Sequence, residues 1–141
     1  MIVVDTNVLS EPLRSRPDTA VVDWLDQQHA ETLFITALSV AELRLGVALL
    51  PPGRRRDRLV AALDTVVFPR FAGRVLVFDE AAAEVWAELQ ARYRGKGRCI
   101  PVIDSLIAAI CLSRGFILAT RNIRDFEGLG IELINPWSDA G

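Results

Sequence analysis

The sequence has few of the side chains that bind zinc or form disulfides. It contains one histidine, His29, and two cysteines, Cys99 and Cys111. The cysteines are twelve positions apart, and neither has a second cysteine at the spacing of a metal-binding pair. We therefore expect two reduced thiols and a solvated histidine. Chemistry that needs a pair of histidines, or a Cys2His2 metal site, is excluded.

Long apolar runs are also absent. The longest, Leu106 to Leu112, is far shorter than the roughly 20 residues that cross a bilayer. Only Met1 to Val4 precede the first charged residue, Asp5, and no basic segment leads them. We therefore expect no secretory signal, no membrane partner and a cytoplasmic location.

The composition suits one folded domain over residues 1–141, because 51% of the 141 residues are hydrophobic and 24% are charged. The same balance excludes a disordered chain, a collagen and a coiled coil. Eighteen acidic and sixteen basic side chains give a net charge of -2. The net charge of the chain therefore does not favour the binding of nucleic acid. A partner that carries phosphate groups needs a local basic patch or a bound cation.

Short apolar segments alternate with helical patterns along the chain. The five expected strands are residues 2–4, 33–36, 75–78, 116–119 and 131–134. Helical patterns cover residues 7–14, a segment that begins at Asp18, and residues 37–50, 53–67, 79–94 and 102–114. Strands separated by helices are typical of the α/β class, with a parallel sheet and helices on both of its faces.

Acidic residues follow the expected strands where parallel sheets form their sites, at the carboxyl ends of the strands. Asp5 directly follows the first strand, and Glu42 lies in the first turns of the helix after the second. Asn122 and Asp125 lie just past the fourth. Asp104 begins a helix that leads into a strand, so the order of the sheet does not place it. We expect the tilt of that helix to bring Asp104 to the same edge.

Two of these acids have the surroundings of buried charges. Asp104 is the one charged residue in the apolar segment 101–110, and Asp5 ends the apolar segment 2–4. Two carboxylates about 4 Å apart repel by roughly 4 kcal/mol at an effective dielectric of 20, so converging acids need protons, basic groups or metal ions. Oxygen ligands without histidine or cysteine suit Mg²⁺ or Mn²⁺. Such an ion can activate water against a phosphodiester, as in metal-dependent nucleases.

Each acid also has an ordinary structural interpretation. Ser39 to Glu42 fits a capping box, in which Glu42 folds back on the start of its helix. Asp104 fits a first-turn acid favoured by the helix dipole, and Asp5 fits an N-cap followed by a turn. Asp125 fits a loop acid. The functional hypothesis depends on the joint placement of the four acids rather than on any one of them.

Four segments in order resemble the PIN domain. They are Met1 to Ser10 with its Asp5-Thr6-Asn7, Ser39 to Leu43, Asp104 to Ala109, and Thr120 to Phe126. Within that family the chain resembles the VapC toxins of type II toxin–antitoxin modules. Residues 41–48 and 71–74, with Asn135-Pro136-Trp137, look like the FitB branch. The resemblance covers essentially the whole chain.

The resemblance implies a three-layer α/β/α fold with a five-stranded parallel sheet, and an endoribonuclease that depends on Mg²⁺ or Mn²⁺. Asp5, Glu42 and Asp104 match the three core acids of the family, as catalytic residues and metal ligands. The fourth position is matched either by Asn122 or by Asp125. We choose Asp125 as the fourth ligand, with Asn122 holding water or substrate.

Thr6 and Thr120 match polar positions at the edge of the family's site, where they would contact substrate. The resemblance further implies an RNA substrate, a VapB- or FitA-like antitoxin that can place a basic side chain among the acids, and a homodimer. Operator DNA would be bound only through the antitoxin. The residues leave open which RNA is cleaved, whether one or two metal ions bind, and the size of the oligomer. Trp86 fits either the core or a dimer interface.

Two rival functions follow from the same residues. A phosphotransfer or phosphatase domain would need a second acid two positions after Asp5, where this chain has Asn7, and a positioned lysine, where it has only Lys96 in a glycine-flanked loop. A catalytically weak PIN-like module would use its acidic pocket mainly to bind an antitoxin peptide. Separately, the basic run from Arg54 to Arg58 fits either a guide for RNA phosphates or a solvated helix start, although arginine there opposes the helix dipole.

Overall fold

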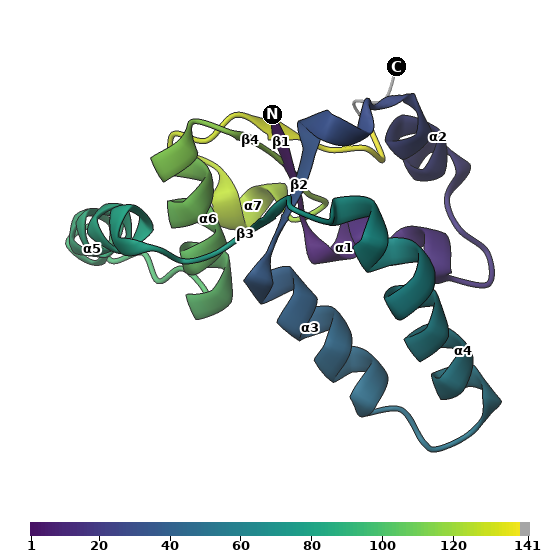
Figure 1. Cartoon of the computed structure of the whole chain (residues 1–141). Helices are drawn as coiled ribbons and strands as arrows, with labels where there is room; N and C mark the ends of the chain where they lie inside the picture. The colour runs from purple at the N-terminus through teal and green to yellow at the C-terminus, as the bar shows by residue number, and fades with distance from the viewer. Residues whose placement is uncertain (139–141) are drawn as a thin grey trace.

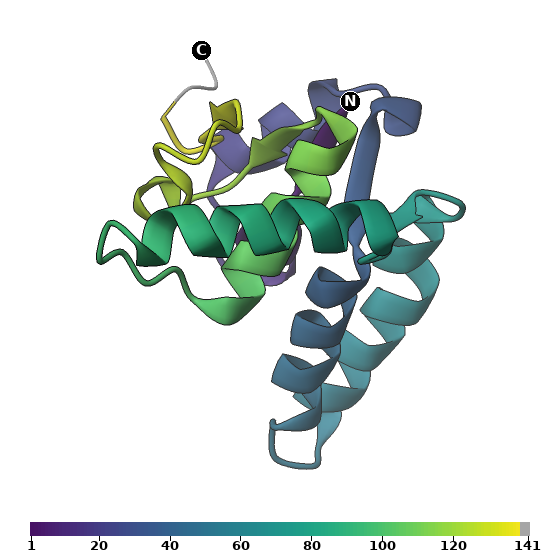
Figure 2. The ribbon, with the colours of Figure 1, turned by 90° about the vertical axis from the view of Figure 1, so that its left-hand side faces the viewer.

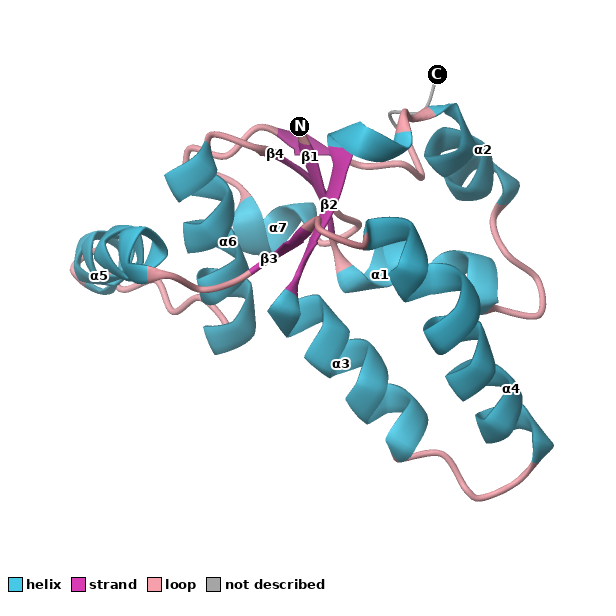
Figure 3. Cartoon of the chain, viewed as in Figure 1, coloured by secondary structure: helices cyan, strands magenta, loops and turns pink. Residues whose placement is uncertain are grey.

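Five short parallel strands form the centre of the molecule, in the order β3-β2-β1-β4-β5 (Figure 3). This computed structural model describes residues 1–138, so residues 139–141 of the predicted domain lie outside the described residues. The predicted five-stranded parallel sheet is confirmed, although its two edge strands are only two residues long. The strands are β1 (Ile2–Val4), β2 (Leu33–Thr36), β3 (Val75–Leu76), β4 (Ile117–Ala119) and β5 (Leu133–Ile134).

Helices cover both faces of this sheet (Figure 1). Alternate residues of a strand point to opposite faces, so Val3 packs with α5 and α6 while Val4 packs with α1 to α3. The predicted three-layer α/β/α arrangement is therefore confirmed. The helices are α1 (Thr6–Ser10), α2 (Thr19–Gln27), α3 (Ala37–Ala48), α4 (Arg54–Ala62), α5 (Glu80–Arg94), α6 (Val102–Arg114) and α7 (Ile123–Phe126).

Two predicted helices are divided in the structure. The pattern over residues 7–14 becomes α1 followed by the 3₁₀ helix η1 (Glu11–Leu13). Pro12 accounts for the change, because it lacks the N–H that would continue an α-helical ladder. The pattern over residues 53–67 becomes α4 followed by one π-helical turn, η3 (Leu63–Val67).

Helices α3 and α4 form an arm that projects away from the sheet, side by side, in both Figure 1 and Figure 2. An ion pair of 2.6 Å between Arg44 of α3 and Asp64 of η3 links the two sides of the arm. The same guanidinium lies 4.7 Å from the centre of the Phe68 ring. The first turns of α3, which carry Glu42, lie at the end of the arm nearest the sheet.

The order of the strands creates a crevice at the carboxyl ends of β1 and β4. The chain leaves β1 toward β2 on one side and later returns to pair β4 on the other, which is where ligands bind in open α/β sheets. Helix α6 turns into β4 through Gly115, whose φ of 68° lies in the left-handed region. Since α6 therefore runs against β4, its direction brings Asp104 to the carboxyl edge. The tilt that we expected is not needed.

The remaining structural predictions concern packing. Leu89 is buried, and the half-buried Trp86 donates a hydrogen bond from Nε1 to Ser105 Oγ at 2.9 Å, so Trp86 joins α5 to α6. Cys111 is buried, Cys99 is exposed, and both are free thiols. None of the helices within residues 1–138 has the length and apolar character needed to span a bilayer.

Two glycines provide a matched test of backbone conformation. A Cβ added at Gly115 or at Gly46 meets no atom within 4 Å, so only the backbone distinguishes them. Gly115→Ala should lower the free energy of unfolding by about 1 kcal/mol, because a left-handed φ is unfavourable for alanine. Gly46→Ala, inside α3, should raise it by about 0.5–1 kcal/mol. Urea unfolding measures both, and two changes of the same sign would contradict the assignment.

Candidate functional site

Asp5 lies at the carboxyl end of β1 with 4% of its surface exposed. Its Oδ1 accepts a hydrogen bond from the Thr6 backbone N–H at 2.8 Å, and its Oδ2 accepts one from the Thr120 hydroxyl at 2.7 Å. The Asp5 N–H donates to the Ala119 carbonyl at 2.9 Å. Asp5 therefore caps α1, as its ordinary interpretation predicts, and also presents a buried carboxylate at the crevice.

Glu42 reaches the same edge from α3. Its Oε1 accepts a hydrogen bond of 2.8 Å from the Thr6 hydroxyl. The alternative interpretation of Ser39 to Glu42 as a capping box does not apply, because Thr36 caps α3 by accepting from the Ser39 N–H at 3.1 Å. The helix thus begins at Ala37, and Glu42 lies beyond the first turn, free of any capping role.

Asp104 lies in the first turn of α6, and Asp125 lies on the short helix α7. The two side chains are close enough that their interaction is one of the causes that raise the pKa of Asp104. Asn122, the other candidate for the fourth position, is exposed at the N-cap of α7, where its backbone N–H donates to Thr120 Oγ1 at 3.0 Å.

Burial and the neighbouring acids disfavour the ionised forms of Asp5 and Asp104. Burial raises the pKa of Asp5, and the charges of Glu42 and Asp125 add to the rise, against the hydrogen bonds that Asp5 accepts. Burial also raises the pKa of Asp104 to about 7, together with hydrogen bonding of its protonated form to Asp125 and the charges of Asp5, Asp125 and Glu42. The structure therefore brings all four predicted acids into one electrostatic cluster, here called the acidic cluster.

No lysine or arginine of residues 1–138 forms an ion pair with the acidic cluster. As the side chains stand, no group of three or more acidic, cysteine or histidine residues in that part of the chain is arranged to hold a metal ion. Threonine hydroxyls instead hold Asp5 and Glu42. Carboxylate oxygens without a paired basic group are nevertheless the ligand type that suits a hard divalent cation.

Asn7 is a polar residue of this edge to which the sequence assigned no role of its own. Its Nδ2 lies 3.5 Å from Thr120 Oγ1 as a donor, and its Oδ1 accepts from the Arg121 N–H at 3.2 Å. The amide thus joins α1 to the segment after β4 by donating on one side and accepting on the other. A carboxylate could not do both, which argues against the phosphotransfer interpretation at this position.

Arg98 is a second residue that sequence reasoning missed. Its guanidinium donates to the carbonyls of Glu127 at 2.7 Å, Asp125 at 3.2 Å and Arg124 at 3.3 Å, at the C-terminal end of α7. It also lies 5.5 Å from the centre of the Tyr93 ring. Arg98 therefore fixes the short helix that carries Asp125. In the sequence it looks like one more surface charge after a glycine-flanked lysine.

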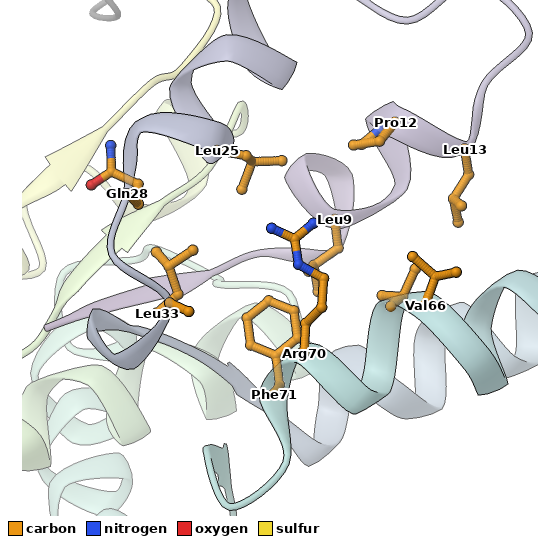
Figure 4. Close-up of a pocket in the computed structure, with 11 residues that line it drawn as sticks. Leu9, Pro12, Leu13, Leu25, Gln28, Leu33, Val66, Arg70 and Phe71 are labelled. Atoms are coloured by element: carbon orange, nitrogen blue, oxygen red, sulfur yellow. The ribbon is translucent and has the colours of Figure 1, made fainter.

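An apolar pocket of about 190 Å³ lies apart from the acidic cluster, among η1, α2 and the turns after α4 (Figure 4). Leu9, Leu25, Leu33 and Phe71 line it, with Arg70 as its one charged residue. Because it contains no carboxylate, general base or nucleophile, this pocket offers no chemistry for bond cleavage. The reactive groups lie at the crevice.

Comparison with known proteins gives a consistent result. A family model described as PIN domain matches residues 2–131. The chain is 46% identical to VapC ribonuclease Y4jK of Sinorhizobium fredii (strain NBRC 101917 / NGR234) over 99% of this chain and 100% of that protein. It is 42% identical to Toxin FitB of Neisseria gonorrhoeae (strain ATCC 700825 / FA 1090), again over 99% and 100%.

The solved structure of FitAB bound to an IR36 DNA fragment contains a chain that superposes on this one with a TM-score of 0.92. The two are 40% identical, and the match covers 97% of this chain and 96% of that one. Similarity to these proteins therefore extends over the whole of the fold that forms the crevice.

The raised pKa of Asp104 predicts how the metal-free protein responds to pH. The ordinary pKa near 4 applies to the unfolded chain, so between about pH 4 and pH 7 only the folded state keeps the proton. Stability contributed by this group therefore falls as pH rises through that window. In EDTA, Asp104→Asn should raise Tm by roughly 2–5 °C at pH 8 and by much less at pH 4.5.

Thermal unfolding at both pH values, with and without Mg²⁺, measures this difference. Added Mg²⁺ should reduce the difference in Tm between the variant and the unaltered chain at pH 8. The reason is that Mg²⁺ would stabilise the unaltered chain, which keeps all four acids, more than it stabilises Asp104→Asn. If the difference in Tm were the same at both pH values, the effect could not come from ionisation of the Asp104 carboxyl.

Proposed function

This chain belongs to the PIN domain family, and from that premise we propose that it is an endoribonuclease dependent on Mg²⁺ or Mn²⁺ and the toxin of a toxin–antitoxin pair. One observation carries the proposal: four acids from four separate segments meet at the switch point of the sheet without a paired basic side chain. The names of the VapC and FitB relatives support the reaction and the role.

The residues proposed to hold the cation are Asp5, Glu42, Asp104 and Asp125. A divalent cation supplies positive charge beside the scissile phosphate and makes deprotonation of the attacking water easier. We favour Asp125 over Asn122 for the fourth position, because Asp125 interacts with Asp104 whereas Asn122 is exposed.

The chain's own residues prepare this site in two ways. The hydroxyls of Thr6 and Thr120 donate to Glu42 and Asp5, and the Thr6 N–H donates to the second oxygen of Asp5, which orients both carboxylates and leaves their remaining lone pairs for ligands. A bound cation would favour the ionised form of Asp104, so its binding would release a proton near neutral pH. In this proposal Thr6 and Thr120 are positioning residues rather than primary contacts of the substrate.

We propose that the RNA phosphates next to the scissile bond lie in a hollow beside Asp125. Arg121, Asn122, Arg124 and Asn135 line it together with Asp125. Arginine forks bind phosphate oxygens, and an asparagine amide can donate to them or hold a water. We assign Asn122 to this substrate-contacting role.

The proposed partners follow from the relatives. FitAB is a two-component assembly that binds DNA, so we propose a VapB- or FitA-like antitoxin for this chain, with operator DNA bound through the antitoxin. A homodimer is part of the same proposal. An RNA substrate would place the protein in the cytoplasm. The uncompensated charge of the acidic cluster equally favours a module that mainly binds a basic antitoxin peptide, and metal-dependent turnover separates the two.

The first test is cleavage of labelled total RNA by the purified, antitoxin-free chain. Discrete fragments should form with Mg²⁺ or Mn²⁺ and not with EDTA. Asp5→Asn should lower the rate by at least about 100-fold, as does loss of a single charge-stabilising group in other enzymes. Asparagine remains a good N-cap, so Tm should be retained.

Asp26→Asn, an exposed acid on α2, is the matched control and should cleave at the wild-type rate. Folded protein that cleaves no RNA in either metal would contradict the nuclease and favour the peptide-binding module. Unchanged cleavage by Asp5→Asn would contradict the site.

The position of Asp125 gives a further prediction. Arg98→Met removes three hydrogen bonds that hold α7 and keeps the length of the side chain. The half-saturating Mg²⁺ concentration should rise about 10-fold, in the range found for residues that orient metal ligands, with a smaller change in rate at saturating Mg²⁺. Arg92→Met, an exposed arginine on α5, is the control. An unchanged Mg²⁺ dependence would show that Asp125 needs no such support.

A further inference from the structure

A groove with three arginines lies between the segment that follows α1 and the first turns of α4. Its volume is about 650 Å³. Arg14 lines one side, Arg55 and Arg58 line the other, and Leu13, Leu59 and Ala62 contribute apolar surface. We call it the arginine groove.

The charge on the α4 side of the arginine groove is not neutralised within the protein. Arg55 and Arg58 have no ion pair or hydrogen-bond partner among residues 1–138. Arg14 contacts the buried Glu11 at 3.3 Å and remains 62% exposed at its side chain. Two full positive charges and one partly compensated charge therefore face the same groove, in a chain whose net charge is -2.

The stability of α4 does not explain these arginines. Both lie in the first turns of a nine-residue helix, where the dipole disfavours positive charge. The acid of the run, Asp57, is not among the residues that line the groove. An anion bound in the groove would offset the unfavourable interaction between these arginines and the helix dipole. Guanidinium groups match phosphate oxygens in geometry.

The arginine groove is close to the acidic cluster along the chain. Arg14 follows Asp5 by nine residues, which pass through α1 and η1. With a rise of about 1.5 Å per residue in α1, about 2.0 Å in η1 and about 3.3 Å for the step to Arg14, these residues span about 17 Å. Helix α1 also packs against α3, which carries Glu42. A single polynucleotide strand with one phosphate at the acids is therefore long enough to have others in the groove.

Resting on the proposed function, we infer that the arginine groove binds the phosphate backbone of single-stranded RNA next to the bond that is cleaved. The acidic cluster repels the substrate's phosphates, so affinity must come from positive charge elsewhere on the surface. Arg55 and Arg58 supply that charge and read no base. They set affinity and the direction of the strand, whereas the acids carry the chemistry.

The test compares two double variants with the same change in charge. R55Q/R58Q empties the groove of its unpaired cations, and R92Q/R94Q removes two exposed arginines from α5. Each is made with and without Asp5→Asn, which prevents cleavage during binding. Fluorescence anisotropy with a labelled short single-stranded RNA, at several KCl concentrations and constant Mg²⁺, measures affinity and its salt dependence.

R55Q/R58Q should weaken binding about 10- to 25-fold at 0.1 M salt and reduce the slope of log K against log salt by about 1.4, or 0.7 for each lost phosphate contact. In the cleavage-competent background KM should rise by a similar factor. R92Q/R94Q should change affinity less than about 2-fold, the response expected of charges more than a Debye length away.

Three results would overturn the inference. Wild-type affinity and slope in R55Q/R58Q, with cleavage intact in the unaltered chain, would refute the groove and leave the nuclease standing. Equal losses in both double variants would assign the effect to overall charge. A chain that neither binds nor cleaves RNA, yet loses its antitoxin when Arg55 and Arg58 are replaced, would refute the proposed function and assign the groove to a protein.

Discussion

The burial of carboxylates that also repel one another is the constraint on which the rest of this structure depends. Asp5 and Asp104 both have a raised pKa, and no lysine or arginine within residues 1–138 forms an ion pair with either. The burial that raises them comes from two apolar cores, one on each face of the sheet. Packing in these two cores stabilises the fold and offsets the unfavourable free energy of the acidic cluster. Hydroxyl donors from Thr6 and Thr120, and the raised pKa of Asp104, lower the electrostatic cost of the acidic cluster when no ligand is bound.

The sheet and the acids at its edge could be predicted because local pattern determines them. An apolar strand ending in Asp5, and helices alternating with strands, suffice to place a carboxylate at the carboxyl edge. The start of α3 at Ala37 could be predicted in the same way, and Thr36 is its N-cap. What the local pattern left open was the role of Glu42, because Ser39 is also a good N-cap residue and Ser39 to Glu42 fits a capping box. The structure shows that Glu42 instead accepts a hydrogen bond from Thr6.

The roles of Asn7 and Arg98 could not be predicted, because each depends on residues distant in the chain. Asn7 bonds to residues more than 110 positions away, and Arg98 bonds to carbonyls 26 to 29 positions away. Neither has a periodicity or a spacing that marks it. Asp104 is intermediate between these cases. The apolar segment around it predicted that it is partly buried. Its place at the site follows instead from the direction of α6, which runs against β4.

A net charge of -2 conceals two regions of opposite charge, the acidic cluster and the arginine groove. In physiological salt the Debye length is about 8 Å, so exposed charges farther apart than that scarcely cancel. Under the proposed function, the acidic cluster can therefore attract cations while the arginines attract phosphate. A metal ion, protons and a basic side chain of a partner then compete for the same negative charge. Under the proposed function, an antitoxin that inserts such a side chain therefore needs no separate inhibitory mechanism. By neutralising the acidic cluster, that side chain would remove the negative charge that attracts the metal ion.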